Sequence, residues 1–403
     1  MKKFLCLALA LCMALSMVAC GGAAASTAAS GSAAASAASG SAAASTSTAA
    51  TAGAIKVGGI GPITGSAAVY GTAVKNGMEL AISETNAEGG IQFEGKFEDD
   101  EHDAEKAVNA YNALKDWGMQ ILMGTVTSTP CVAVAAETAN DNMFELTPSA
   151  SSADVIKNGN VFQVCFTDPN QGIASADYIA DNKLATKVAV IYDSSDVYSS
   201  GIHDKFVAEA GTKGLQVVAD EAFTADSNKD VSVQVEMAQS AGAELVFLPI
   251  YYTEAALILN TANQAGYKPV FFGCDGLDGL LSVENFDTSL AEGVMLLTPF
   301  AADSTDAKTQ AFVKAYKDKY GDTPNQFAAD AYDAMYILKA CAEKAGITSD
   351  MSVSDICEAM KAAITSTSVD GLTGTGMTWS ATGEVNKAPK AVKIVNGAYT
   401  AMD

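Results

Sequence analysis

Hydroxyl, aromatic and glycine residues gather in six short segments, each placed directly after an apolar run. Ser hydroxyls and the N–H groups at helix starts suit a carboxylate, whereas tyrosine rings suit an apolar group or a cation. Asp275 adds a carboxylate that can receive an ammonium group. These groups predict a site for a zwitterion of amino-acid size. The segments are GPITGSAAVYG (61–71), GTVTSTP (124–130), TPSASS (147–152), YDSSDVYSSG (192–201), PIYYTE (249–254) and GCDGLDG (273–279).

The chain contains no arginine, because all 24 of its basic residues are lysine. A bidentate guanidinium fork is therefore not available to hold an anionic ligand. A carboxylate has to be bound by hydroxyls, backbone N–H groups, helix N-termini or a lysine. The net charge of −23 over 403 residues argues against a nucleic-acid partner, which requires a basic surface.

No pattern in the sequence predicts catalysis, a metal site or a cofactor. The two histidines, His102 and His203, are not accompanied by a GxSxG nucleophile motif. GGIGPITG (58–65) lacks the GxGxxG spacing of a dinucleotide site. EDDEHD (98–103) could chelate a cation, but we interpret it as a strand end followed by a helix cap. The five cysteines after Cys20 form no CxxC pair, and we interpret them as small buried apolar residues.

The first 53 residues have the composition of an export signal followed by a tether. Two lysines precede an apolar stretch, 4–15, which is shorter than the ~20 residues that span a bilayer. The segment MVAC, which ends at Cys20, resembles the lipobox of bacterial lipoproteins, in which the cysteine carries a lipid. Residues 21–53 are almost only Ala, Ser, Gly and Thr, which cannot bury enough apolar surface to fold. We predict a signal peptide over 1–19, lipidation at Cys20 and a linker over 20–53.

From residue 54 onward, short apolar runs alternate with segments of helical periodicity. IKVGGIG (55–61) predicts a strand, Gly89 predicts the end of the helix that follows, and Asp103 predicts the N-cap of the next helix. The same alternation starts again at KVAVIYD (187–193). Such alternation is typical of parallel sheets with helices on both faces, and two rounds predict two doubly wound lobes.

The last third of the chain is mainly helical. Helical segments at 305–320, 326–346 and 352–364 follow a predicted strand at 293–300, and short strands are predicted in TGMTWS (375–380) and KAVKIVNGAY (390–399). We expect this part to cover the first lobe and then to pair with the second. The fold class is therefore α/β, with two doubly wound parallel-sheet lobes joined by a hinge that the chain crosses several times. The predicted boundaries are 54–168 with 302–388 for lobe 1, and 169–301 with 389–403 for lobe 2.

The predicted cleft follows from the same arrangement. In open α/β sheets, ligands bind outside the carboxyl ends of the strands, so the polar segments after the strands should face one another between the lobes. We expect the chain to cross between the lobes near Thr167–Asp168, Pro299–Ala302 and Lys387–Lys390. Closure of the lobes about these three crossings would enclose a ligand.

Residues 55–403 resemble the branched-chain amino-acid (Leu/Ile/Val) binding proteins of ABC importers, which have the type I periplasmic-binding fold. The resemblance rests on GPITGSAAVYG, on GTVTSTPCVAVAAE with ELTPSASS, and on YYTE with GCDG. It implies an acidic group for the ligand's ammonium, three residues that bind the ligand's backbone atoms, and aromatic pocket walls. These are Asp275 for the ammonium, Ser128, Ala150 and Ser151 for the backbone atoms, and Tyr70, Tyr198 and Tyr251 for the walls.

Three positions depart from the family pattern. Asp275 stands where the best-known members have the longer Glu, which can change the depth of the pocket. Ser151 stands where a Thr is usual. His102 and Thr127 stand where some members have a disulfide, so that bridge is absent.

The resemblance implies an exported solute-binding lipoprotein on the outer face of the bacterial cell membrane. It would bind an amino acid, in particular a branched-chain aliphatic one, and deliver it to the permease subunits of an ABC importer. We expect a monomer that touches membrane lipid through Cys20, is not an enzyme, and uses no cofactor or metal. The alternatives are a sensor of the same fold that reports to a membrane signalling protein, and a binder of small amides or aromatic acids.

Overall fold

The computed structural model describes residues 53–402 of the chain. The predicted signal peptide, the predicted lipidation site Cys20 and the linker up to residue 52 therefore lie outside the described residues. Between residues 53 and 402, no helix is both long enough and apolar enough to cross a membrane.

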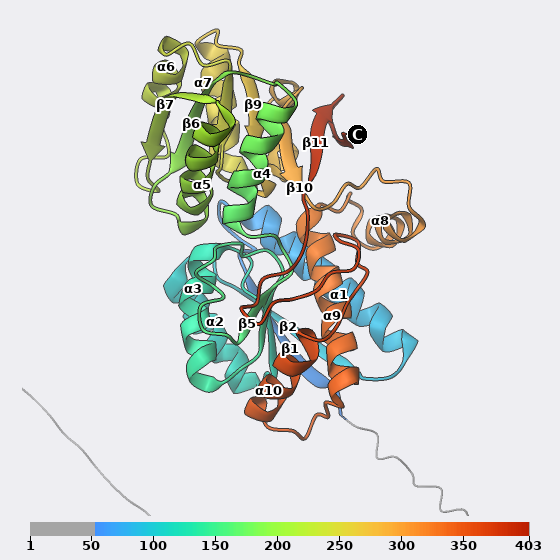
Figure 1. Cartoon of the computed structure of the whole chain (residues 1–403). Coiled ribbons are helices and arrows are strands. Elements are labelled where there is room, and N and C mark those ends of the chain that lie inside the picture. The colour runs from blue at the N-terminus through green and yellow to red at the C-terminus, as the bar shows by residue number, and fades with distance from the viewer. Residues whose placement is uncertain (1–52, 403) are drawn as a thin grey trace, which may run out of the picture. The chain divides into compact units, whose positions relative to one another are not determined.

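The first sheet has five parallel strands; in chain order, helices connect the first four, and a segment without a helix connects the fourth to the fifth (Figure 1). The strands are β1 (Ile55–Gly61), β2 (Phe93–Asp99), β3 (Ile121–Gly124), β4 (Glu145–Thr147) and β5 (Val161–Gln163). The helices are α1 (Ala68–Glu88), α2 (Ala104–Trp117) and α3 (Ser128–Asp141). The strand order is β2-β1-β3-β4-β5. Every residue of β3, β4 and β5 is buried, as expected for parallel strands covered on both faces.

The second sheet has seven strands in the order β12-β11-β10-β9-β8-β6-β7. They are β6 (Lys187–Asp193), β7 (Gln216–Phe223), β8 (Leu245–Leu248), β9 (Val270–Gly273), β10 (Met295–Thr298), β11 (Lys390–Val395) and β12 (Ala398–Ala401). Strands β6 to β10 are parallel, whereas β11 and β12 form an antiparallel extension. The helices are α4 (Asp168–Asp181), α5 (Val197–Lys213), α6 (Ser232–Ser240) and α7 (Tyr252–Gln264). Three short 3-10 turns follow β9: η1 (Asp275–Leu277), η2 (Leu280–Ser282) and η3 (Thr288–Ala291).

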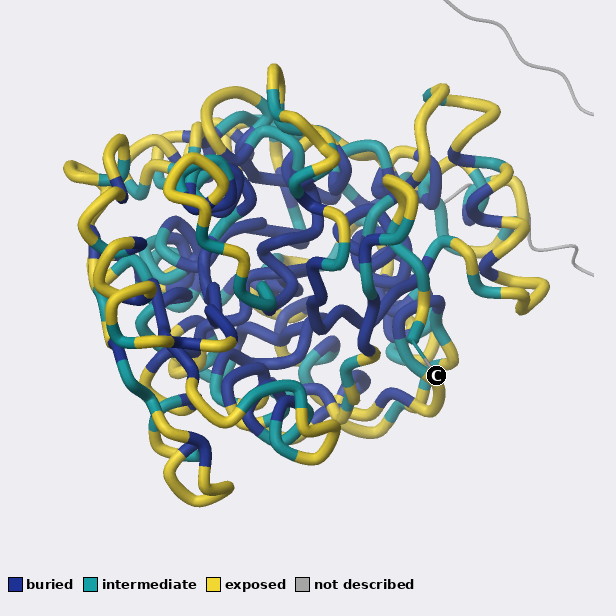
Figure 2. Tube along the Cα trace, turned by 90° about the horizontal axis from the view of Figure 1, so that it is seen from above, coloured by how far each residue is buried: buried dark blue, intermediate teal, exposed yellow. Residues whose placement is uncertain are grey.

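After β10 the chain returns to the first sheet as α8 (Ala307–Tyr320), α9 (Gln326–Ala345) and α10 (Val353–Ile364). Helix α9 packs closely against α1, since a Cβ at Gly77 would lie 2.3 Å from the carbonyl oxygen of Ala328. Only glycine fits at such a contact. We call the first sheet with its helices, including α8 to α10, lobe 1, and the second sheet with its helices lobe 2. Figure 2 shows that the buried parts of the chain lie in the interior.

The chain passes between the lobes after β5, after β10 and before β11. The last passage is held by a buried ion pair, in which Lys387 Nζ lies 2.9 Å from Asp330 Oδ1 on α9. The predicted α/β fold of two doubly wound lobes joined by several crossings is confirmed. The residue boundaries predicted for the lobes stay a prediction.

Several local signals of the sequence are found in the structure. Gly89, with φ of +86°, ends α1, and the Asp103 carboxylate caps α2 by accepting the N–H of Lys106 at 2.9 Å. The strand predicted in 375–380 is wrong, because this segment makes only two isolated bridges. Gly376, with φ of +62°, turns the backbone there, and Trp379 is fixed by donating its Nε1–H to the Gln163 carbonyl at 2.8 Å.

Candidate ligand-binding cleft

A small cavity of about 10 Å³ lies between the segments that follow strands of both sheets. This volume is room for about one water molecule. Of the seven residues that the sequence predicted, five line the cavity, and five others join them. The predicted ones are Tyr70, Ser128, Tyr198, Tyr251 and Asp275, and the others are Val126, Thr127, Ser149, Gly276 and Phe327.

Lobe 1 contributes hydrogen-bond donors through the start of α3. Ser128 is the first residue of this helix, and the side chain of the preceding Thr127 makes no capping hydrogen bond. The first-turn N–H groups and the helix dipole therefore favour an anion at this point. Ser128 Oγ accepts the N–H of Ser152 at 3.1 Å, which leaves the hydroxyl proton free to be donated.

Lobe 2 contributes a buried carboxylate. Asp275, at the start of η1, is 4% exposed. Its Oδ1 accepts the hydroxyl of Tyr198 at 2.7 Å, and its Oδ2 accepts the Nε2–H of Gln171 at 3.1 Å. Burial raises the pKa of Asp275 to about 7, although the Tyr198 hydrogen bond opposes this shift. Within residues 53–402, no lysine or histidine forms an ion pair with this carboxylate.

Aromatic rings form the wall beside Asp275. Tyr251 stacks on Tyr198, with ring centroids 4.9 Å apart and an interplanar angle of 13°. Tyr251 also meets Tyr70 edge to face, at 5.5 Å. The Tyr70 hydroxyl donates to the Gly276 carbonyl at 2.5 Å and accepts the N–H of Tyr252 at 3.3 Å. Both bonds join α1 of lobe 1 to lobe 2, so this wall is shared between the lobes.

Other hydrogen bonds also connect the lobes at the cleft. Thr129 Oγ1 donates to Asp196 Oδ1 at 2.8 Å, and Thr253 Oγ1 donates to the Ser66 carbonyl at 2.9 Å. His102 and Thr127, which stand where some family members have a disulfide, contact each other through a hydrogen bond. His102 Nδ1 lies 2.8 Å from Thr127 Oγ1. Burial lowers the pKa of His102, although the carboxylate of Asp196 opposes this shift.

Two of the predicted site residues, Ala150 and Ser151, do not line the cavity. The N–H of Ala150 donates to Thr147 Oγ1 at 2.9 Å, and the Ala150 carbonyl accepts the Nε2–H of Gln163 at 2.8 Å. Both backbone groups of Ala150 are therefore used by the protein itself. The Ser151 hydroxyl is buried and has no hydrogen-bond partner among residues 53–402. A role for these two residues in ligand binding stays a prediction.

The sequence analysis missed Ser149 and Phe327. Ser149 lies in the quoted segment TPSASS, one residue before Ala150, and its hydroxyl donates to the Val126 carbonyl at 2.7 Å. Phe327 is the second residue of α9, and its ring centroid lies 4.2 Å from that of Tyr70. The N-cap Asn325 marks the start of this helix in the sequence, but nothing local shows that the helix start reaches the cleft.

The segment 98–103 forms a strand end and a helix start, as we interpreted it. Asp100 Oδ1 accepts the N–H of His102 at 2.8 Å, and Asp103 caps α2. In the described part of the chain, no three His, Cys, Asp or Glu side chains are placed to hold a metal ion. The five cysteines between residues 53 and 402 are buried and unpaired.

A cavity between two lobes, with hydrogen-bond donors on one side and a carboxylate on the other, is the arrangement of a small-molecule binding protein. The family comparison agrees with this class. The chain belongs to the periplasmic binding protein family, whose model matches residues 54–398.

Individual relatives support the predicted resemblance, which is confirmed. A Leu/Ile/Val-binding protein homolog from Brucella melitensis is 33% identical, over 73% of this chain and 80% of that protein. Two solved structures, each 26% identical with a TM-score of 0.78, cover 87% of this chain. One is a leucine-binding protein from Thermotoga maritima, 98% covered. The other is the branched-chain amino acid transporter substrate-binding protein of Streptococcus pneumoniae in complex with isoleucine, 99% covered.

Proposed function

We propose that this chain binds an α-amino acid, of the branched-chain aliphatic type, between its two lobes. The observation that carries the proposal is the placement of Asp275 opposite the start of α3, across one cavity. A carboxylate with a pKa raised to about 7 by burial is costly to ionise unless a cation joins it. The ammonium group of an amino acid supplies that cation.

The other groups of the site suit the rest of an amino acid. The Ser128 hydroxyl and the first turn of α3 bind the ligand's carboxylate, and Ser151, which precedes the Ser152 whose N–H Ser128 accepts, offers a second hydroxyl. Tyr70, Tyr251 and Phe327 surround an apolar side chain. The relatives carry the names of a Leu/Ile/Val-binding protein homolog and of a branched-chain amino acid transporter substrate-binding protein. These names support a ligand with a branched aliphatic side chain.

Ligand entry requires the lobes to move. A cavity of about 10 Å³ is far smaller than a leucine molecule, and hydrogen bonds such as that of Thr129 to Asp196 join the lobes beside it. We propose that the lobes separate and close about the three crossings near Thr167–Asp168, Pro299–Ala302 and Lys387–Lys390. Small-angle scattering should show a smaller radius of gyration with ligand bound, and an unchanged radius would contradict closure.

Membrane anchoring and delivery complete the proposal. The lipobox-like sequence at Cys20 and the uncharged segment 21–53 support an exported lipoprotein that serves the permease of an ABC importer. Cys20→Ser should leave the protein unprocessed or release it from the membrane. If processing and membrane retention are unchanged in this variant, the anchor is not at Cys20.

The ligand can be tested by a thermal-shift screen of the twenty common amino acids and of small carboxylic acids. A true ligand at 100 times its dissociation constant stabilises the folded protein by about 2.7 kcal/mol. Leucine, isoleucine or valine should give the largest shifts. Shifts from acids without an amino group, and none from amino acids, would overturn the proposal.

A further inference from the structure

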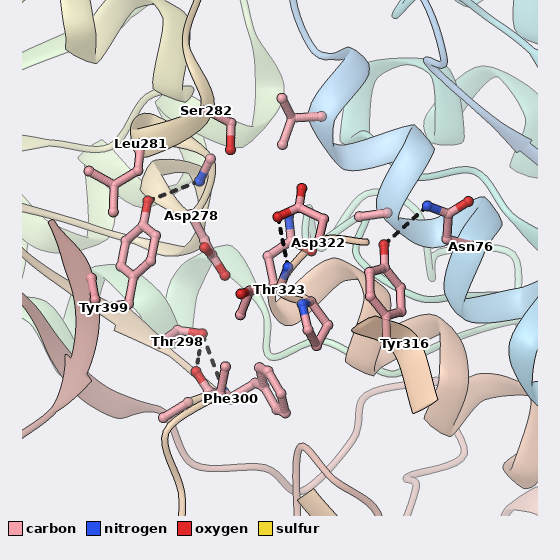
Figure 3. Close-up of a pocket in the computed structure, with 18 of the residues that line it drawn as sticks. Asn76, Asp278, Leu281, Ser282, Thr298, Phe300, Tyr316, Asp322, Thr323 and Tyr399 are labelled. Carbon is pink, nitrogen blue, oxygen red and sulfur yellow. Dashed lines mark hydrogen bonds between the residues drawn. The ribbon is translucent and has the colours of Figure 1, made fainter. Parts of the chain in front are cut away.

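A second cavity, with a volume of about 860 Å³, lies beside the chain crossing that follows β10 (Figure 3). Its walls come from both lobes: α1 and α8 on one side, and residues 278–282, which include η2, with β11, β12 and the turn between them on the other. The volume is within the range of about 300–1,000 Å³ that small-molecule sites have. None of the residues used for the amino-acid site lines this cavity.

Asp278 is the buried charge of this second cavity. It is 6% exposed, and Figure 3 shows its side chain directed toward the middle of the cavity. Its Oδ2 accepts the N–H of Gln326 at 2.8 Å, at the start of α9. Its Oδ1 receives no hydrogen bond from residues 53–402, and no lysine or histidine among them forms an ion pair with it. Asp278 therefore resembles Asp275, which lies three residues earlier and faces the other cavity.

Aromatic rings on two sides give the cavity apolar surface. The rings of Tyr316 and Tyr320 on α8 lie 4.8 Å apart, and both hydroxyls bond to Asn76 on α1. Opposite them, the Tyr399 hydroxyl donates to the Leu277 carbonyl at 2.9 Å and accepts the N–H of Gly279 at 3.1 Å. These bonds fix the rings, so they form a prepared surface for an apolar or aromatic group.

The charged groups at the rim favour a cation. Asp303 and Asp322 line the cavity together with Asp278, whereas Lys317 is the one basic residue in its lining. Tyrosine faces also attract cations. A neutral polyol would satisfy the hydroxyls and amides but would leave the Asp278 carboxylate uncompensated. A metal ion is a poor fit, because no three suitable ligands converge among residues 53–402.

We propose that this cavity is a second ligand site, which binds a small organic amine with an aromatic or apolar body. The ammonium lies on Asp278 and the body lies against the rings of Tyr316, Tyr320 and Tyr399. This site is separate from the amino-acid site. An amine held there touches both lobes beside one of the crossings.

The test uses isothermal titration calorimetry of the full chain with 2-phenylethylammonium, in the presence of excess L-leucine. The uncharged isostere 2-phenylethanol is the matched ligand. The amine should bind at least tenfold more tightly than the alcohol. Asp278→Asn should remove most of this difference, whereas Asp275→Asn should leave amine binding unchanged.

Two exposed or half-exposed positions keep the test decisive if Asp278→Asn does not fold. Lys317→Gln removes a like charge and should strengthen amine binding severalfold at low salt, and Tyr320→Ala should weaken it. The proposal is overturned if neither compound binds at millimolar concentration, if the two bind equally, or if the folded variants leave amine binding unchanged. It is also overturned if leucine displaces the amine or if Asp275→Asn abolishes amine binding, since the amine then lies in the cleft. A chain that binds the amine in this way but does not bind leucine would contradict the proposed function alone.

Discussion

The two sides of the cleft differ in the groups that they present to the cavity. The lining from lobe 1 carries no charged side chain, and its polar groups are hydroxyls and the start of a helix. The lining from lobe 2 carries one carboxylate, Asp275, which tyrosine and glutamine side chains hold in place. A molecule with an anionic and a cationic end satisfies both sides at once. If the lobes close on a ligand as we propose, closure selects a zwitterion, because neither side alone carries groups for both of its ends.

Of the substitutions that test this difference between the two sides, the replacement of Asp275 should lower leucine affinity the most. Asp275→Asn leaves the ammonium of a bound amino acid without its partner, which costs about 2–5 kcal/mol. At 1.4 kcal/mol per decade, leucine should bind roughly 30-fold more weakly or worse. Calorimetry measures the change, and Asp287→Asn, an exposed carboxylate of the same lobe, is the matched control. Normal leucine binding by a folded Asp275→Asn protein would remove lobe 2 from ammonium recognition.

Removing the hydroxyl of Ser128 tests the opposite side. Ser128→Ala deletes the proposed hydrogen bond to the ligand's carboxylate, which would be worth about 1.5 kcal/mol or more and so about tenfold in affinity. The nearby Ser149 hydroxyl donates to the Val126 carbonyl, so Ser149→Ala should have a smaller effect. Equal losses from the two variants would show that the start of α3 has no special role.

The pH dependence of leucine binding tests whether the ionised Asp275 of lobe 2 receives the ligand's ammonium group. Burial raises the pKa of Asp275 to about 7 in the absence of a cationic partner. Its ionised fraction therefore rises about tenfold between pH 6 and pH 8, and leucine should bind about tenfold more tightly at pH 8. Calorimetry at a series of pH values checks this sign. The dependence should disappear in Asp275→Asn, and affinity that falls as pH rises would contradict the assignment.

The smallest expected effect concerns a bond that joins the two sides. Thr129→Val removes the hydrogen bond from Thr129 to Asp196 and favours the open arrangement by about 0.5–1.5 kcal/mol. Leucine affinity should fall by about two- to tenfold, chiefly through faster dissociation measured by stopped flow. The matched variant Thr253→Val removes the hydrogen bond to the Ser66 carbonyl, and leucine should also dissociate faster from this variant. Unchanged dissociation in both variants would mean that these bonds do not hold the lobes closed.

Much of the cleft could be predicted because its residues follow strands directly. Ser128, Tyr198 and Asp275 follow β3, β6 and β9 within a few residues, so chain order alone places each of them at the carboxyl edge of its own sheet. The helix end predicted at Gly89 and the N-cap predicted at Asp103 were confirmed for a similar reason, since helix ends depend on neighbouring residues.

The remaining site residues depend on packing between distant segments. Phe327 reaches the cleft only because α9 packs against α1 and brings its first turn beside Tyr70. Ala150 was placed in the site by resemblance, but local hydrogen bonds to Thr147 and Gln163 use its backbone groups. Asp278 stands in the quoted segment GCDGLDG, yet only the three-dimensional turn of η1 shows that it faces a different cavity from Asp275.

One calorimetric comparison tests the account most directly. L-leucine and 4-methylpentanoate share the carboxylate and the branched side chain, and only leucine carries the ammonium group that Asp275 is proposed to receive. The wild-type chain should bind leucine roughly 30-fold more tightly or better, in line with the cost of an unpaired buried charge. Equal or tighter binding of 4-methylpentanoate would contradict the proposal that the cleft recognises an α-amino acid.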